Sequence, residues 1–142
     1  DVSLRCCFDA LAPEPGQADQ LIVIEGREIR VRWLADDVAW FDFAALCDGP
    51  RSQNDYIELA REYHAVLISN VPQLDANRDD QARRFINLVD EFYDRSVKLV
   101  LAAEVPLDQL YGGHRLRFEF ERTKSRLLEM QSHEYLAREH KP

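Results

Sequence analysis

Residues 64–103, HAVLISNVPQLDANRDDQARRFINLVDEFYDRSVKLVLAA, contain two short apolar runs on either side of an amphipathic segment. The runs at 64–69 and 97–103 have the length and continuous apolar character of strands buried on both faces of a parallel sheet. Residues 78–95 predict a helix, because apolar side chains recur there at helical spacing: Ala82, Phe85, Ile86, Val89, Phe92 and Tyr93. A strand, a helix and a strand with short connections form a right-handed βαβ unit. The sequence therefore predicts an α/β fold.

The preceding residues predict a helix followed by a small antiparallel sheet. Residues 1–19 combine helical spacing with a linker that contains proline and glycine. Over residues 20–43, Gly26 separates two apolar runs that form a hairpin, and residues 39–43 add a third strand. Because the chain begins at Asp1, without a methionine and inside the predicted helix, we expect it to be part of a larger protein.

The second half of the chain predicts further elements around the βαβ unit. Ser52 and Asp55 form a capping-box pattern that indicates the start of a helix. After the second buried strand we expect a short helix at 106–111, then a strand that ends at Phe120, then a final helix to about Arg138.

The chain is short enough for one main domain. Its 142 residues divide into an N-terminal helix and linker (1–19) and a C-terminal α/β domain (20–142). Within that domain, 20–43 form the antiparallel meander, and 52–142 form the βαβ unit with a C-terminal helix.

Charge and composition disfavour several functional classes. The formal net charge is −8, which does not favour nucleic-acid binding, since that binding is driven by clustered Lys and Arg. The longest apolar run, 97–103, is too short to span a membrane. Three cysteines, Cys6, Cys7 and Cys47, match neither a disulfide framework nor a zinc spacing. We predict reduced thiols, no metal site, no nucleic-acid partner and no membrane span.

Polar residues follow both buried strands. Asn70 ends the first and Glu104 ends the second, and each is followed by Val and Pro. Ligands of open α/β sheets bind outside the carboxyl ends of the strands, so these two side chains are candidates for a functional edge. If the strands are neighbours, the side chains lie about 5 Å apart. Alternatively, both are ordinary loop residues and the prolines end the strands.

Arg122 and Arg126 lie one helical turn apart in the segment 118–136, where like charges repel on an exposed helix. One interpretation is a solvated stripe in which Arg126 pairs with Glu129. The other is anion recognition, in which a guanidinium binds a phosphate or a carboxylate with two hydrogen bonds.

Aromatic side chains in the meander suggest a docking surface. Trp33, Trp40 and Phe41 are candidates, since exposed aromatic residues anchor protein interfaces. Arg30 and Arg32 alternate with apolar residues in the second strand, so we expect them on its solvated face.

Four ordered motifs occur along the chain: FDFAALC, NDYIELAREYHAVLISNVPQL, ARRFINLVDEFYDRSVKLVLAAEVPLDQLY and FEFERTKSRLLEMQSHEYL. Together they resemble the C-terminal part of the ZapE-like ATPases, which are bacterial cell-division-associated P-loop ATPases related to the mitochondrial lactation-elevated-protein family. The resemblance extends from about Val31 to the end of the chain.

The resemblance implies a fragment of an AAA-like protein of the bacterial cytoplasm that hydrolyses ATP with Mg²⁺. The phosphate-binding loop would lie in an N-terminal portion, which would be the partner of this domain, and the fragment alone would be inactive. Arg122 and Arg126 would act as sensors or as an arginine finger on a neighbouring subunit of a homo-oligomer. The family commonly has Asp at the position of Asn70, and an amide cannot serve as a metal ligand of that kind or as a general base.

Two functions of different classes follow. In the first, the domain completes or regulates the ATPase core. In the second, it is a non-catalytic interaction module that docks division machinery or client proteins.

Overall fold

The computed structural model describes residues 2–12 and 14–141. Residues 1, 13 and 142, which the predicted domain ranges include, lie outside the described residues. In chain order the elements are α1 (Val2–Leu11), β1 (Gln17–Ile24), β2 (Arg27–Ala35), β3 (Val38–Asp42), α2 (Phe43–Cys47), α3 (Gln53–Glu62), β4 (Ala65–Val71), η1 (Ala76–Arg78), α4 (Asp79–Asp94), β5 (Lys98–Ala103), η2 (Leu107–Gln109), α5 (Arg117–Glu129) and α6 (His133–Leu136).

The strands form one five-stranded mixed sheet in the order β1-β2-β3-β4-β5. β1, β2 and β3 are antiparallel neighbours, which confirms the predicted meander. β3 then pairs with β4 in parallel, and β4 pairs with β5 in parallel around α4, which confirms the βαβ unit. The meander and the βαβ unit are therefore parts of a single sheet. Strand patterns alone indicated two separate pieces, because they do not show that β3 has a partner on its second side.

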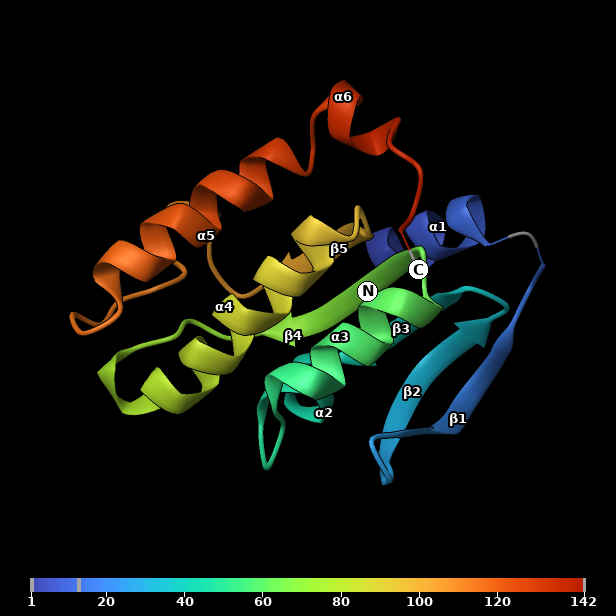
Figure 1. The fold of residues 1–142 in the computed structure, drawn as a ribbon, viewed down its shortest axis with the longest axis horizontal. Coiled ribbons are helices and arrows are strands. Elements are labelled where there is room, and N and C mark those ends of the chain that lie inside the picture. Colours follow the sequence, from blue (N-terminus) through green and yellow to red (C-terminus); the bar gives the residue numbers. More distant parts are fainter. Residues whose placement is uncertain (1, 13, 142) are drawn as a thin grey trace.

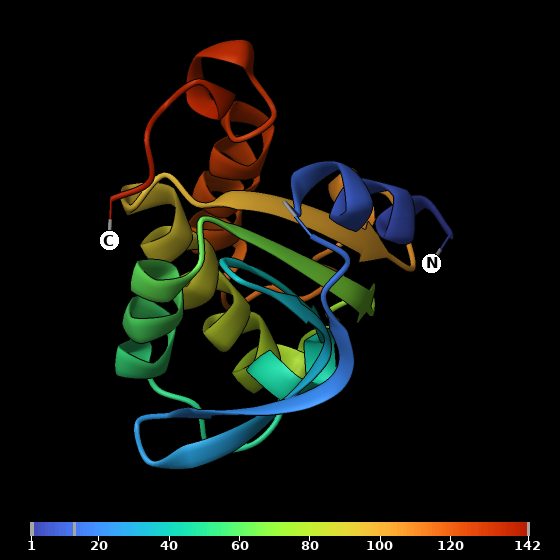
Figure 2. The ribbon, with the colours of Figure 1, turned by 90° about the vertical axis from the view of Figure 1, so that its right-hand side faces the viewer.

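Helices cover both faces of this sheet (Figures 1 and 2). On one face α1 packs through Leu4 and Phe8 against buried residues of β3 and β4. On the other face lie α2, α3 and α4, and the amphipathic stripe of α4 is buried as predicted, with Phe85, Val89 and Phe92 fully inaccessible. α5 lies alongside α4 and farther from the sheet (Figure 1).

The C-terminal segment differs from the prediction. The expected strand that ends at Phe120 is instead the first turn of α5. Phe118 and Phe120 alternate with glutamates as in a strand, but on a helix they point to different sides. Phe120 is buried and stacks on Tyr111 with ring centroids 5.3 Å apart, whereas Phe118 is 87% exposed. Packing of Phe120 against α4 and the Tyr111 loop therefore favours helix over the strand-like local pattern.

The expected single final helix is also interrupted. α5 ends at Glu129, and the short helix α6 begins after Ser132, whose hydroxyl accepts a hydrogen bond from the Tyr135 N–H. The buried Tyr135 hydroxyl lies within hydrogen-bond distance of the backbone oxygens of Phe92 and Val97, at 3.1 and 2.7 Å. These contacts hold α6 against the α4–β5 connection, so the chain must turn there.

Asp55 connects the meander to α3. The capping box predicted from Ser52 and Asp55 is present, and the Asp55 carboxylate accepts a hydrogen bond of 2.6 Å from the Ser52 N–H. The same oxygen lies 2.6 Å from Nη2 of Arg27, at the start of β2. Asp55 is fully buried, and the charge of its carboxylate is compensated by Arg27, which lies 28 positions earlier in the chain.

We expect Asp55→Ala to lower the free energy of unfolding by about 3 kcal/mol, because loss of one partner from a buried ion pair is strongly destabilising. Urea unfolding followed by circular dichroism measures this. Asp9→Ala is the matched control: Asp9 pairs with Arg5 on the exposed surface of α1, where an ion pair contributes at most about 0.5 kcal/mol. Equal losses for the two variants would contradict this role of Asp55.

Candidate functional site

The strand-tip residues lie at the same edge of the sheet. β4 and β5 are parallel neighbours, so their carboxyl ends meet, and Asn70 and Glu104 both line a hollow of about 400 Å³ there. Each side chain is already engaged by the protein. The Asn70 amide donates a hydrogen bond of 2.8 Å to Oδ1 of Asp42, and the Glu104 carboxylate accepts one of 3.0 Å from the Gln73 N–H. Both residues therefore hold the connections that follow the strands.

Asn70 also has an unusual backbone conformation. Its φ of 59° lies in the left-handed region, where the ladder between β4 and β5 is irregular between Ile68 and Val71. Asparagine tolerates this region better than most residues with a side chain. The amide is thus suited both to the backbone conformation and to donation toward Asp42, which a carboxylate could not provide.

A polar network that the sequence analysis missed lies beneath Asn70. The Ser69 hydroxyl is fully buried and lies 2.9 Å from Oδ1 of Asp42. It accepts hydrogen bonds from Nη1 of Arg32 at 2.8 Å and from Nε1 of Trp40 at 3.2 Å. The network joins β2, β3 and β4.

This network leaves the serine without the features of a nucleophile. The Ser69 hydroxyl has two acceptors for its proton, Oδ1 of Asp42 at 2.9 Å and the backbone oxygen of Phe41 at 3.4 Å. Both of its lone pairs accept hydrogen bonds, so the oxygen has no free lone pair for attack. Arg32 was expected on a solvated face, yet it lies over the ring of Trp40 and pairs with Asp42 at 3.4 Å. The one signal available in the sequence was a serine inside an otherwise apolar strand, since a buried hydroxyl needs partners.

The arginine pair faces an anion within the chain. Both guanidinium groups contact Asp90 of α4: Nη2 of Arg122 lies 3.3 Å from Oδ2, and Nη1 of Arg126 binds Oδ1. The alternative prediction, in which Arg126 pairs with Glu129, is wrong. Glu129 accepts a hydrogen bond of 2.7 Å from the Tyr93 hydroxyl and pairs with Arg138.

The two arginines differ in accessibility. The Arg126 side chain is 27% exposed and its guanidinium lies 4.9 Å from the ring centroid of Tyr93, whereas Arg122 is 56% exposed. One carboxylate faces two guanidinium groups, so the cluster has one uncompensated positive charge, and Arg122 is its more accessible member.

The strand tips and the arginine cluster do not form one site. α4 begins at the edge where β4 ends, and Asp90 lies 11 residues after its first residue, Asp79. At 1.5 Å per residue, this places the arginine cluster about 16 Å along the helix from that edge.

The expected exposure of the aromatic cluster is wrong. Phe41 is fully buried and Trp40 is 2% exposed, because β3 is a central strand covered on both faces. Trp33 is partly buried against Phe8 of α1, with Arg5 over its ring. These residues belong to the hydrophobic core and pack against α1. The docking hypothesis depended on their exposure, and the structure does not support it at this surface.

The described ranges 2–12 and 14–141 contain neither a metal-binding cluster nor a membrane-spanning helix. No three His, Cys, Asp or Glu side chains gather there in a way that could hold a metal ion. No helix in that part of the chain is both long enough and apolar enough to cross a membrane.

Comparison with known proteins identifies the family. The model of the AFG1-like ATPase family matches residues 2–139. The chain belongs to the AFG1-like ATPase family. It is 47% identical over 131 residues to cell division protein ZapE of Escherichia coli, which covers 92% of this chain and 35% of that protein. It is 37% identical over 111 residues to lactation elevated protein 1 homolog B of Danio rerio, which covers 78% of this chain and 22% of that protein.

The alignment covers a much larger share of this chain than of its relatives. This AFG1-like chain is aligned over nearly its whole length, yet it spans about a third of ZapE. No solved structure gives a significant match.

We expect Asn70→Ala to lower the free energy of unfolding by about 1 kcal/mol, because alanine is strained at positive φ. Asn70→Gly is the matched variant: it also loses the hydrogen bond to Asp42 but adopts this conformation freely. Urea unfolding should place Asn70→Gly above Asn70→Ala in stability. The reverse order would contradict a left-handed Asn70.

The cysteines should differ in reactivity. Burial raises the pKa of the Cys47 thiol to about 12, whereas Cys6 is exposed. Since the thiolate is the reactive form, we expect a maleimide at pH 8 to modify Cys6 within minutes and to leave Cys47 unmodified in the folded protein. Mass spectrometry of peptides measures this. Denaturant should expose Cys47, and its rapid modification without denaturant would contradict the buried position.

Proposed function

We propose that this chain is the C-terminal α/β domain of a bacterial, cytoplasmic, cell-division-associated ATPase, and that it completes or regulates an ATPase core whose phosphate-binding loop lies elsewhere in the protein. The observation that supports this proposal most is the match of nearly the whole chain to about a third of ZapE, together with membership of the AFG1-like ATPase family. A phosphate-binding loop motif does not occur in the 142 residues.

The residues of this domain do not fit a Mg²⁺–nucleotide site. Asn70 offers an amide that donates to Asp42, and Glu104 is engaged by the backbone of Gln73. Ser69, which could otherwise supply a hydroxyl ligand, has its hydrogen-bonding capacity filled. ATP and Mg²⁺ would therefore be held by the N-terminal portion, which is the proposed partner of this domain.

We infer that Arg122 is the residue of this domain that binds a nucleotide held by that portion or by a neighbouring subunit. It shares Asp90 with Arg126, and its contact to that carboxylate is 3.3 Å long. A guanidinium that is half-exposed and incompletely neutralised can change rotamer and donate two hydrogen bonds to a phosphate. Arg126 lies deeper, over Tyr93, and would orient Asp90.

In the full-length protein that contains this domain, Arg122→Ala should lower the ATPase kcat by roughly 10³-fold, which is the lower range of the effect of an arginine finger. Arg83→Ala is the matched control, since Arg83 is 53% exposed and pairs across the same helices with Glu119 at 3.4 Å. Steady-state ATP hydrolysis by both variants is the measurement. An unchanged kcat for Arg122→Ala would contradict the role proposed for Arg122.

The wider proposal is tested by removal of the domain. ATP hydrolysis by the full-length protein, with and without the residues that match this chain, should be compared at several protein concentrations. We expect the truncated protein to lose activity. Full activity after truncation would contradict the proposal and favour the non-catalytic docking module instead.

A further inference from the structure

The edge strand β1 is open along one side. It lies at the end of the sheet and pairs with β2, and within residues 2–12 and 14–141 no strand pairs with its other side. Figure 1 shows β1 at the right-hand border of the molecule, with no element beyond it. A strand of this kind presents a row of unpaired N–H and C=O groups that can bind a further strand.

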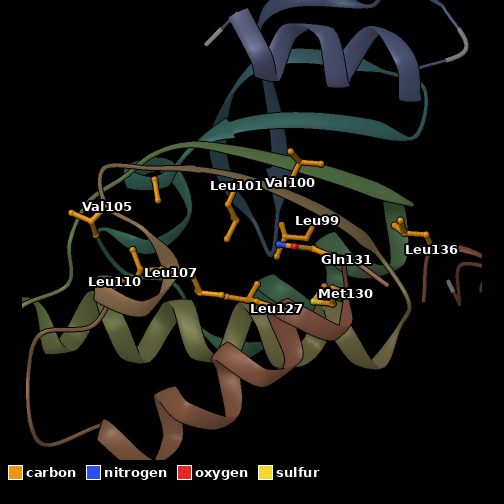
Figure 3. A pocket seen from close by; sticks show the side chains of 11 residues that line it. Leu99, Val100, Leu101, Val105, Leu107, Leu110, Leu127, Met130, Gln131 and Leu136 are labelled. Atoms are coloured by element: carbon orange, nitrogen blue, oxygen red, sulfur yellow. The ribbon is translucent and has the colours of Figure 1, made fainter. Parts of the chain in front are cut away.

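The opposite edge of the sheet is not open in this way. Residues at the end of α5 and in the segment that follows it stand beyond β5, and they wall a hollow of about 510 Å³ at that edge (Figure 3). Leu127 and Met130 form part of this wall. A strand could be added to β5 only by displacing these C-terminal elements. β1 is therefore the edge at which another polypeptide has room to pair.

The hairpin turn determines which backbone groups of β1 face outward. Ile24 pairs with Arg27 across the two-residue turn 25–26, and both turn residues have positive φ, at 51° and 76°. Such a turn closes with a hydrogen bond between its two flanking residues, so Ile24 directs its backbone groups toward β2. Because the direction alternates along an antiparallel strand, Leu21 and Val23 direct their N–H and C=O groups toward the open edge.

The side chains of the same two residues are exposed apolar groups. Leu21 is 58% exposed and Val23 is 65% exposed, whereas the alternate residues Ile22 and Ile24 pack against the core. Residues 20–24 include neither a charged residue nor a proline, which are common means of protecting a natural edge strand from pairing. This edge is therefore suited to an extended segment that places apolar side chains beside Leu21 and Val23.

The surroundings of the β1 edge are acidic. Asp19 and Glu25 lie at the two ends of the segment 20–24. A hollow of about 640 Å³ lies between the hairpin turn and α3, and three carboxylates and one guanidinium contribute to its lining. The lining residues are Glu25, Asn54, Ile57, Glu58, Arg61 and Glu62. Among residues 2–12 and 14–141, none of the three carboxylates has an ion-pair partner. These groups are therefore available to cations of a bound polypeptide.

We propose that the β1 edge binds an extended polypeptide segment in which apolar and basic residues alternate. The apolar residues of this segment lie beside Leu21 and Val23 and share backbone hydrogen bonds with them. The residues between them project to the opposite face of the sheet, because successive side chains of a strand alternate. α3 lies on that face, and lysine or arginine side chains there reach the carboxylates of Glu58 and Glu62 while their aliphatic stems cover Ile57. This interaction goes beyond the role proposed in ATP hydrolysis and does not depend on it.

A second copy of the chain is a poorer match for this edge. The antiparallel register that pairs Leu21 with Val23 of the second copy also places Asp19 opposite Glu25 of the second copy, and the two-fold axis repeats this contact. Parallel pairing in register places each of these carboxylates beside its own counterpart. Like charges at opposed positions are destabilising. The charge at this edge therefore specifies a basic partner and disfavours self-association.

Binding of a synthetic peptide to the full-length protein that contains this domain tests the proposal. The probe is fluorescein-labelled KVKVKVK amide, whose pattern reads the same in both strand directions, and fluorescence anisotropy measures its affinity. We expect it to bind about tenfold more tightly than KKVVVKK amide, which has the same composition and charge but does not alternate. Equal affinities would indicate general attraction to an acidic protein and would overturn the proposal. No binding, as when another part of the protein covers β1, would also overturn it.

Variants of the edge test which groups bind the peptide. Val23→Pro removes an outward N–H and should weaken binding about tenfold, since proline is tolerated on an edge strand where the missing N–H faces solvent. Glu58→Lys should weaken binding by a similar factor, because it places like charges together. Glu134→Lys is the matched control: it makes the same charge change at an exposed position of α6 and should leave binding unchanged. Circular dichroism should show that each variant is folded. Binding that is insensitive to both Val23→Pro and Glu58→Lys would overturn the proposal.

Hydrogen exchange tests the mode of binding. β2 already protects the N–H groups of Ile22 and Ile24, whereas those of Leu21 and Val23 face the open edge. Addition of KVKVKVK amide should therefore protect about two further amides in the segment 20–24, as measured by mass spectrometry of proteolytic fragments of the full-length protein. Bound peptide without added protection in this segment would overturn strand addition at β1.

Discussion

Parallel pairing of β3 with β4 is the constraint on which the rest of the structure depends. The ladder runs from Val38 opposite Ala65 to Asp42 opposite Ser69 and joins the meander to the βαβ unit. It makes β3 a central strand, so alternate side chains enter two different cores. Trp40 packs under α1, and Phe41 packs beneath the helices on the other face. Without this ladder, the residues of the meander and those of the βαβ unit would not pack together in either core.

At the end of that ladder, polar side chains at the carboxyl edge of the sheet form hydrogen bonds with one another. Asp42 and Ser69 meet there, and Arg32 supplies the charge that a partly buried carboxylate requires. Asn70 adds a further donor to Asp42 from a left-handed backbone position. Polar groups at this edge thus satisfy one another. Their arrangement stabilises the strand ends and the turns that follow them.

Between α4 and α5, in contrast, one charged side chain stays accessible. Asp90 accepts contacts from two arginines, and Arg122 stays half-exposed beside it. The cluster therefore both joins the two helices and presents positive charge at the surface.

The sequence by itself determined the elements whose signals are local. The apolar stripe of α4, the Ser52–Asp55 capping box and the strands around α4 follow from spacing within a few residues, and all are present. The order of motifs also indicated the ATPase family. Only the tertiary structure decided that Phe120 belongs to a helix and that Asp90 is the anion facing the arginine pair. It also decided that the meander aromatics are core. These outcomes depend on contacts between residues far apart in the chain, and the energy of such contacts exceeds local preference.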